Sequence, residues 1–322
     1  MNVKPKVVFS ACLGFESCRY NGQTINAPFV SKLAGAVDAV TVCPERDIHL
    51  GIPRDPLRLV DGEKTVHLYQ PATGRDVTEQ MQNFTASFLD GFSEDGVDGF
   101  VLKTRSPSCG IGDVKIYHSF KPEAGAARGA GLFGGEVKNR FSGAAIEDEG
   151  RLNNFTLREH FLIKLYAAAA FRQAARAGTI NGLLDFHTNN KLLFMAYNQE
   201  VMREMGRILA SYDKKNLDSV GDRYSQKFEE MFQEPYRYTA MINVLLHGFG
   251  GLSQHLSKEE VQFFLNTIEE YRDERVPLSV PLHLLKSWAI RHQNDYLLNQ
   301  SFIAPYPRDL TEISDSGKGR NL

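Results

Sequence analysis

Three short apolar runs in the first third of the chain each end at or just before a cysteine motif, and this pattern constrains the fold more than any other feature. The runs cover residues 6–12, 38–43 and 98–103. Between the last two, residues 73–88 carry apolar side chains at helical spacing, which predicts a crossover helix. Strands that alternate with helices indicate a parallel sheet, whose ligand sites lie beyond the carboxyl ends of the strands. We therefore expect an α/β domain with a mainly parallel, Rossmann-like sheet and with its cysteines at one edge.

An acidic turn at residues 147–150 divides the chain, because strand patterns precede it and helical spacing follows it. A chain of 322 residues is also long for a single hydrophobic core. We expect the α/β domain to occupy residues 1–150 and an all-α helical bundle to occupy residues 151–322.

Several helices are predicted in the second half of the chain. Apolar residues recur at helical spacing over residues 157–177, 191–209 and 281–297. Ser257 and Glu260 form a capping-box pattern that opens a further helix. These patterns leave no strand signal in this region, which is why we expect a helical bundle there.

The bulk composition is that of an ordinary globular protein, with 42% hydrophobic and 24% charged residues. The formal net charge of −2 provides no general attraction to nucleic acid, so any such site must be a local patch. There is no secretion signal and no apolar run of about 18 residues, so we expect a cytoplasmic protein without a membrane segment. In a reducing cytosol, spaced cysteines bind metals or do chemistry more often than they form disulfides.

The four cysteines, Cys12, Cys18, Cys43 and Cys109, all lie in the first third of the sequence. Their spacing matches neither a zinc-finger pair nor the ferredoxin run, and they include no C-x-x-C redox motif. A parallel sheet would nevertheless bring the strand ends that carry them together. The sequence therefore predicts a soft-metal or iron–sulfur site assembled from separate loops, and a zinc ion remains an alternative.

Polar residues beside these cysteines suit proton transfer. Glu45 stands two residues after Cys43, and Ser106 and Ser108 shortly precede Cys109. Carboxylate and hydroxyl groups next to a bound metal can move protons and orient water at a substrate. These three side chains are therefore candidate catalytic residues.

A glycine-rich stretch at residues 125–135 is a separate feature. It has no Lys-Ser/Thr ending of a phosphate loop, and no strand pattern leads clearly into a dinucleotide-binding motif. A flexible connection or tight packing is the preferred interpretation.

Three sequence blocks resemble the signature blocks of the thiouracil desulfidase family. They are Ser-Ala-Cys12 with Cys18-Arg-Tyr-Asn-Gly22, Cys43-Pro-Glu45 with Gly51-Ile-Pro-Arg54, and Lys103-Thr-Arg-Ser-Pro-Ser-Cys109-Gly110. The blocks stand in the family's order, and the resemblance extends over about residues 5–145. The helical remainder resembles a domain of formerly unknown function that is often fused to this family. Chains that join the two regions look like bacterial tRNA 4-thiouridine desulfidases.

The resemblance implies a 4Fe-4S cluster held by Cys12, Cys43 and Cys109, with one iron open to a thiolated base. It also implies a hydrolysis that turns the C=S group of thiouridine into the C=O group of uridine, with the sulfur captured on the open iron. Three roles remain open for Cys18, namely a fourth ligand, a transient sulfur acceptor or a packed thiol.

In this reaction we expect Glu45 to act as a general base or acid toward water. Ser106 is the first candidate for positioning the base or sharing the proton, and Ser108 is the second. The leading prediction is a tRNA 4-thiouridine desulfidase. One alternative is a desulfidase of free 2-thiouracil or small thionucleosides, and another is a non-catalytic iron–sulfur or metal sensor that binds nucleic acid.

Basic residues within and beside the three blocks are candidates for contacting RNA phosphates. The helical domain is expected either to bind the RNA or to brace the first domain, and no protein partner is implied. The candidate phosphate contacts are Arg19, Arg46, Arg54, Lys103 and Arg105.

Overall fold

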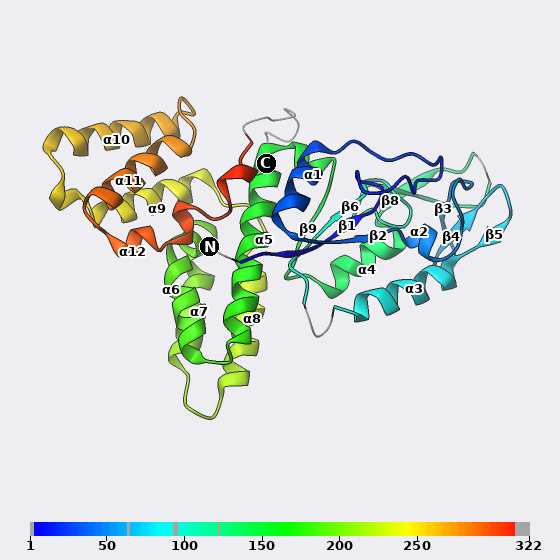
Figure 1. The fold of residues 1–322 in the computed structure, drawn as a ribbon, viewed down its shortest axis with the longest axis horizontal. Coiled ribbons are helices and arrows are strands. Elements are labelled where there is room, and N and C mark those ends of the chain that lie inside the picture. Colours follow the sequence, from blue (N-terminus) through cyan, green and yellow to red (C-terminus); the bar gives the residue numbers. More distant parts are fainter. Residues whose placement is uncertain (1–2, 63–64, 93–95, 122, 313–322) are drawn as a thin grey trace. The chain divides into compact units, whose positions relative to one another are not determined.

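The structure is a computed structural model that describes residues 3–62, 65–92, 96–121 and 123–312 (Figure 1). By its internal contacts the chain divides into two compact units. The first contains the described residues up to Ala169 and those from Asp309 onward, and the second is Ala170–Arg308.

A four-stranded sheet lies at the centre of the first unit, in the strand order β2-β1-β6-β9. Its strands are β1 (Lys6–Ser10), β2 (Asp38–Val42), β6 (Gly99–Leu102) and β9 (Ala145–Asp148). All three neighbouring pairs are parallel. The structure thus confirms the predicted parallel sheet and places the carboxyl ends of all four strands at one edge.

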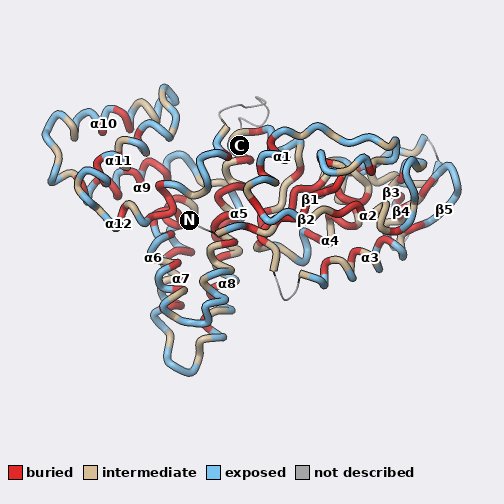
Figure 2. Tube along the Cα trace, in the orientation of Figure 1, coloured by how far each residue is buried: buried red, intermediate tan, exposed pale blue. Residues whose placement is uncertain are grey.

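Helices of the first unit connect and cover these strands. They are α1 (Pro28–Ala36), α2 (Pro44–Asp47), α3 (Thr78–Asp90) and α4 (Leu132–Arg140). Because the strands of a covered parallel sheet are buried on both faces, they appear in the sequence as continuous apolar runs. Figure 2 shows the resulting concentration of buried residues in this sheet. The core combines strand and helix residues, namely Val8, Val42, Leu89, Phe100, Leu102, Phe133 and Val137.

A second sheet, of five short strands, was not predicted from the sequence. Its order is β5-β4-β3-β7-β8, and only the β3–β7 pair is parallel. The strands are β3 (Arg58–Asp61), β4 (Val66–Gln70), β5 (Arg75–Asp76), β7 (Val114–Tyr117) and β8 (Ala126–Gly129).

One face of this second sheet is apolar. Leu59, Leu68 and Val114 pack in a buried cluster with Val77 and Met81, the latter from α3. The helix α3 therefore contributes to the cores of both sheets.

The rest of the described chain is helical, which confirms the predicted fold class. The long helix α5 (Phe155–Arg176) agrees closely with the predicted helix, and the division between the two units falls within it. None of the helices in the described part of the chain is long and apolar enough to span a membrane. The helices of the second unit are α6 (Ile180–Tyr197), α7 (Gln199–Ala210), α8 (Leu217–Met231), α9 (Tyr238–Gly250), α10 (Lys258–Arg272), α11 (Ser279–Arg291) and α12 (Asp295–Leu298).

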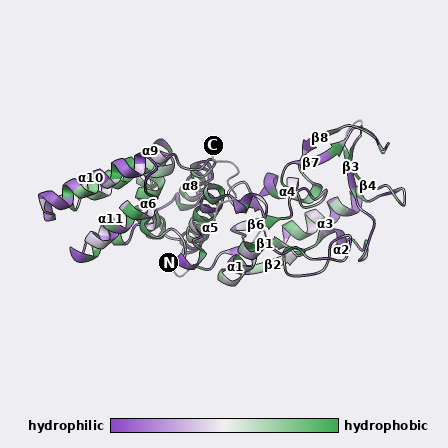
Figure 3. Cartoon of the chain, turned by 90° about the horizontal axis from the view of Figure 1, so that it is seen from above, coloured by the Kyte–Doolittle hydropathy of each residue, from purple (hydrophilic) through white to green (hydrophobic). Residues whose placement is uncertain are grey.

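Two helix ends show how side chains decide these boundaries. Ser257 and Glu260 form the predicted capping box at the start of α10. The single helix predicted over residues 191–209 is wrong, because the chain breaks between α6 and α7 at Asn198. The Asn198 side chain accepts hydrogen bonds from the backbone N–H groups of Glu200 and Val201 and so caps α7. Figure 3 shows hydrophobic and hydrophilic residues mixed along α10 and α11, as amphipathic helices require.

Candidate active site

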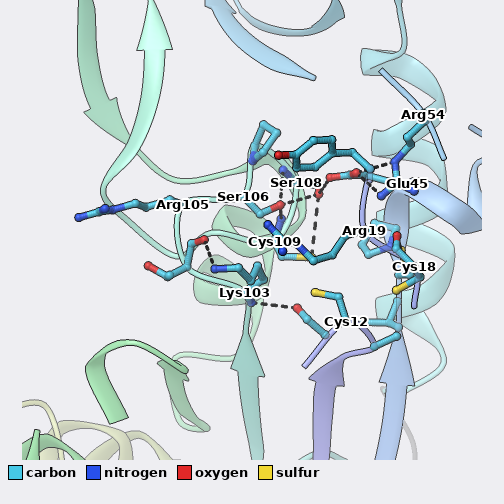
Figure 4. A pocket seen from close by; sticks show the side chains of 18 residues that line it. Cys12, Cys18, Arg19, Glu45, Arg54, Lys103, Arg105, Ser106, Ser108 and Cys109 are labelled. Atoms are coloured by element: carbon cyan, nitrogen blue, oxygen red, sulfur yellow. Dashed lines mark hydrogen bonds and ion pairs between the residues drawn. The ribbon is translucent and has the colours of Figure 1, made fainter. Parts of the chain in front are cut away.

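A cavity of about 290 Å³ is lined by residues from the carboxyl ends of β1, β2 and β6 and from the loops that follow them (Figure 4). Every residue predicted for the site lines this cavity except Arg46. The fold therefore brings together side chains that lie up to 97 residues apart in the sequence, from Cys12 to Cys109. This is the position at which parallel α/β sheets bind their ligands.

All four cysteines are free thiols, and each lines this cavity. Cys12 follows β1, Cys43 directly follows β2 and begins α2, and Cys109 lies in the loop after β6. Cys18 is buried beside Cys43 and Cys12. The Cys43 thiol donates a hydrogen bond to the carbonyl oxygen of Cys18 over 3.7 Å.

The surroundings of Cys18, Cys43 and Cys109 favour the protonated form of these thiols. Burial raises the pKa of the Cys109 thiol to about 12. A hydrogen bond with Cys12 is the main cause that raises the pKa of Cys18 to about 11, and burial contributes further. A hydrogen bond with Cys18, followed by burial, raises the pKa of Cys43 above its usual range. Because thiolates are the metal-binding form, cofactor binding at this site would release protons.

The donor set of free thiols fits an iron–sulfur cluster. Within the described ranges, no group of three or more His, Cys, Asp or Glu side chains is placed to hold one ion. A single zinc ion needs its thiolates to converge at ~2.3 Å from one point. In a cluster each cysteine binds a different iron, so the thiols can surround a cavity without converging.

A hydrogen-bonded chain of acid–base groups runs along another wall of the cavity (Figure 4). The Ser108 hydroxyl donates to Oε1 of Glu45 over 2.7 Å, and the hydroxyls of Ser106 and Ser108 are 3.0 Å apart. The Ser106 oxygen also accepts from the backbone N–H groups of Ser108 and Cys109, over 3.3 and 3.1 Å. Because the Ser108 proton points to Glu45, Ser106 must donate to Ser108. Proton movement can thus follow the order Ser106, Ser108, Glu45.

Arg54 is the partner of the other Glu45 oxygen. Its Nε donates to Oε2 over 2.8 Å, and its Nη2 donates to the same atom. The Arg54 side chain is only 3% exposed, and Nη1 donates to the carbonyl oxygen of Gly51 over 3.1 Å. A guanidinium in this position stabilises and orients the Glu45 carboxylate. Sequence reasoning placed Arg54 among RNA contacts and gave no sign of this pairing.

Two other predicted basic residues are also held by ion pairs. Lys103 Nζ lies 2.5 Å from Oε1 of Glu149, whose side chain is 10% exposed. Arg46 pairs with Asp47 and Glu16, and it lies outside the cavity lining. These internal pairs offset the charges that were expected to face RNA.

Arg19 and Arg105 remain more accessible at the cavity. Arg105 is 72% exposed and forms an ion pair with Asp113 over 3.0 Å. The guanidinium of Arg19 lies over the ring of Tyr20, 5.7 Å from its centroid. Tyr20 also lines the cavity and is 43% exposed.

Two lining residues were missed by sequence reasoning although they stand inside the motifs. Tyr20 belongs to the block that follows Cys18, where only Arg19 was selected. Ser10 accepts a hydrogen bond from the backbone N–H of Lys103 over 2.9 Å and hydrogen-bonds to the Cys109 thiol. The sequence could have identified Ser10 as a site residue, because it lies at the end of a strand, two residues before Cys12.

The glycine-rich stretch serves tight packing at this site. The start of α4 lies against the loop that carries Cys109, and Gly134 N–H donates to the carbonyl oxygen of Ser108 over 3.0 Å. Gly131 N–H donates to the carbonyl oxygen of Gly110 over 2.7 Å. A Cβ atom at either glycine would collide with backbone of this loop. Glycine therefore permits the close approach that holds Cys109 in place.

Two family models match separate parts of the chain. The family model described as 2-thiouracil desulfurase matches residues 7–149. A second model, described as a protein of unknown function (DUF1722), matches residues 191–307.

Relatives and a solved structure add to these matches. Uncharacterized protein YbbK of Bacillus subtilis (strain 168) is 34% identical over 113 residues, which are 34% of this chain and 75% of that protein. Uncharacterized protein YbgA of Escherichia coli (strain K12) is 29% identical over 149 residues, or 46% of this chain and 88% of that protein. The solved structure of the [4Fe-4S]-dependent thiouracil desulfidase TudS is 29% identical, with a TM-score of 0.39, over 46% of this chain and 93% of that chain.

The parallel sheet, the cavity lined with free thiols and the adjoining acid–base chain define an α/β enzyme. The chain belongs to the 2-thiouracil desulfurase family and is a sulfur-removing enzyme. These findings confirm the resemblance drawn from the three sequence blocks.

Proposed function

We propose that this protein is a 4Fe-4S-dependent desulfidase that converts 4-thiouridine in tRNA to uridine. One observation carries the proposal: thiols from three neighbouring strand ends and a hydrogen-bonded chain of acid–base groups line the same cavity. The thiols suit a soft cofactor, and the acid–base chain suits the activation of water. A thione placed between these two walls would have its sulfur near the soft cofactor and its carbon near the activated water.

Cys12, Cys43 and Cys109 are the residues that would hold the cluster, since each belongs to a different strand end of the sheet. When bound, a cluster with three protein ligands supplies a Lewis-acidic iron with affinity for soft sulfur. Cys18 is buried between two of these cysteines and is assigned to packing and to holding their thiols in position.

The chain's own residues provide the proton transfers of the hydrolysis. Glu45 accepts a proton from the water that attacks the thione carbon, while Arg54 keeps the carboxylate oriented. Ser108 and Ser106 relay protons between Glu45 and the substrate. The reaction balances as thione plus water giving a carbonyl group and hydrogen sulfide, so it needs no external oxidant or reductant.

An exposed basic residue at the cavity supports the expectation of an RNA substrate, and the size of the cavity suits a single base. A cavity of about 290 Å³ admits a single base, so a thiolated base in RNA would have to leave its stack to reach the thiols. Arg105 lines this cavity and is 72% exposed, so it is available to contact the phosphate of such a nucleotide. The same cavity size also suits the free base, which keeps desulfuration of free 2-thiouracil or a small thionucleoside as the second candidate.

Anaerobic purification of the full chain tests both parts of this function. We expect bound iron and sulfide, and loss of the near-ultraviolet absorption of thiolated tRNA on incubation, with a higher kcat/KM than for free 2-thiouracil. Turnover by protein without iron would overturn the cluster assignment. Turnover of the free base alone would overturn the assignment of the RNA substrate.

A further inference from the structure

The second face of the five-stranded sheet is built differently from the face that packs against α3. Successive residues of a strand point to opposite faces, so Arg58 and Val60, the neighbours of Leu59 in β3, lie on the face away from α3, where Val60 is covered and only 1% exposed. Arg58 stands opposite Tyr69 of β4, and Val60 stands opposite both His67 and Tyr117. These side chains therefore share the outer face.

Aromatic and basic groups pack together on this outer face. The guanidinium of Arg58 lies over the ring of Tyr117, 4.8 Å from its centroid. The ring of Phe120, in the connection between β7 and β8, meets Tyr69 edge-on with centroids 4.8 Å apart. It also lies 6.2 Å from the ring of His67. We call these residues, together with Lys115, the aromatic sheet face.

The aromatic sheet face remains accessible. Phe120 is 52% exposed, Tyr69 and Tyr117 are half-buried, and Lys115 is exposed. In the described part of the chain, Lys115 has no ion-pair partner. Accessible rings on a sheet, with cations between and beside them, are the arrangement on which single-stranded nucleic acids stack their bases and place their phosphates.

A line of basic side chains connects this face to the catalytic cavity. Arg105, which lines the cavity, pairs with Asp113 at the start of β7. Arg128 of β8 pairs with the same carboxylate over 3.1 Å and stands opposite Lys115 in the sheet. Because Arg105 and Arg128 share the single carboxylate of Asp113, the surface between the cavity and the sheet carries a net positive charge. An RNA strand that presents a base to the cavity would meet positive charge as it continues toward the sheet.

We propose that the aromatic sheet face binds the RNA segment next to the thiolated nucleotide. Bases stack on Phe120 and Tyr117, and phosphates contact Arg58 and Lys115. This inference rests on the RNA substrate of the proposed function and adds a binding surface outside the cavity.

The test measures the Kd of the anaerobic, cluster-loaded full chain for fluorescently labelled tRNA. We expect Phe120→Ala to weaken binding roughly 5–150-fold, as the loss of one stacked base implies, and Phe120→Tyr to restore it. Lys115→Gln should reduce the slope of log Kd against log salt concentration by about 1. Lys4→Gln is the matched control, because Lys4 is also an exposed lysine without an ion-pair partner in the described part of the chain, and it is absent from this face.

The variants should change the binding of tRNA but not the turnover of the free base. Turnover of free 2-thiouracil by Phe120→Ala should equal that of the wild type, since the face lies outside the cavity. An unchanged Kd and salt slope in both variants, with tRNA still desulfurated, would overturn this inference and leave the proposed function standing. A wild-type chain that neither binds nor desulfurates tRNA would overturn both.

Discussion

Replacing Glu45 by Gln is the sharpest test of the acid–base chain. In the structure, Oε2 of Glu45 accepts from Nε and Nη2 of Arg54, and Oε1 accepts from Ser108. Glutamine preserves the size of the side chain but removes the negative charge and one acceptor oxygen. The Glu45→Gln variant can no longer take a proton from water.

Two separate losses are expected from this change. General acid–base catalysis contributes about 10²–10⁴-fold to a rate, so kcat should fall by that factor. Arg54 is 3% exposed and would lose its counter-ion, and breaking one half of a buried ion pair costs about 3–5 kcal/mol of folding stability. The glutamine oxygen still accepts one hydrogen bond from Arg54, so a loss of about 3 kcal/mol is expected.

Turnover and stability must therefore be measured separately. Turnover is followed anaerobically by the near-ultraviolet absorption of the thiolated substrate, normalised to iron content, and stability by urea unfolding. Asp98→Asn is the matched control, because Asp98 is also a buried carboxylate, accepts a hydrogen bond from the backbone N–H of Lys6, and does not line the cavity. It should lose stability and keep kcat within a few-fold.

Two results would refute this reasoning. Wild-type turnover by the iron-loaded Glu45→Gln variant would show that Glu45 is not the acid–base group. An equal loss of kcat in Asp98→Asn would show that the effect arises from a weakened fold.

Three further predictions concern the neighbouring residues. Ser108→Ala should lower kcat about 10–150-fold at full iron content, since it removes one hydrogen bond to a carboxylate. Ser106→Ala should lower the iron content as well, because two backbone N–H groups of the Cys109 loop lose their acceptor. Cys18→Ser should retain the iron and sulfide that Cys12→Ser loses, and equal iron loss in both would make Cys18 a ligand. Gly134→Ala should reduce both the thermal midpoint and the iron content, because its methyl group would collide with the loop backbone, and wild-type values would contradict the packing argument.

The central strands β1 and β6 of the parallel sheet were predictable because burial on both faces leaves them as uninterrupted apolar runs, whereas the edge strand β9, with the sequence Ala-Ile-Glu-Asp, was not predicted. β6, for example, is buried at all four positions. The five-stranded sheet was not predictable in this way. β5 has only two residues and both are exposed, and β7 alternates between the two faces over only four residues, which is too short for a clear prediction. Pairing with neighbours in space, rather than local pattern, makes these segments strands.

The sequence by itself determined which residue types are present and where they stand along the chain. Cysteines at strand ends, with Glu45 and two serines beside them, were sufficient to predict a thiol-rich site at the sheet edge. Only the tertiary structure decided the contacts among them, because hydrogen bonds depend on side-chain positions across long separations. It paired Arg54 with Glu45, ordered the serines into a chain, and placed Cys18 between two other thiols. It also put Arg46 outside the cavity, although that residue is adjacent to Glu45 in the sequence, because neighbouring side chains on one helical turn point in different directions.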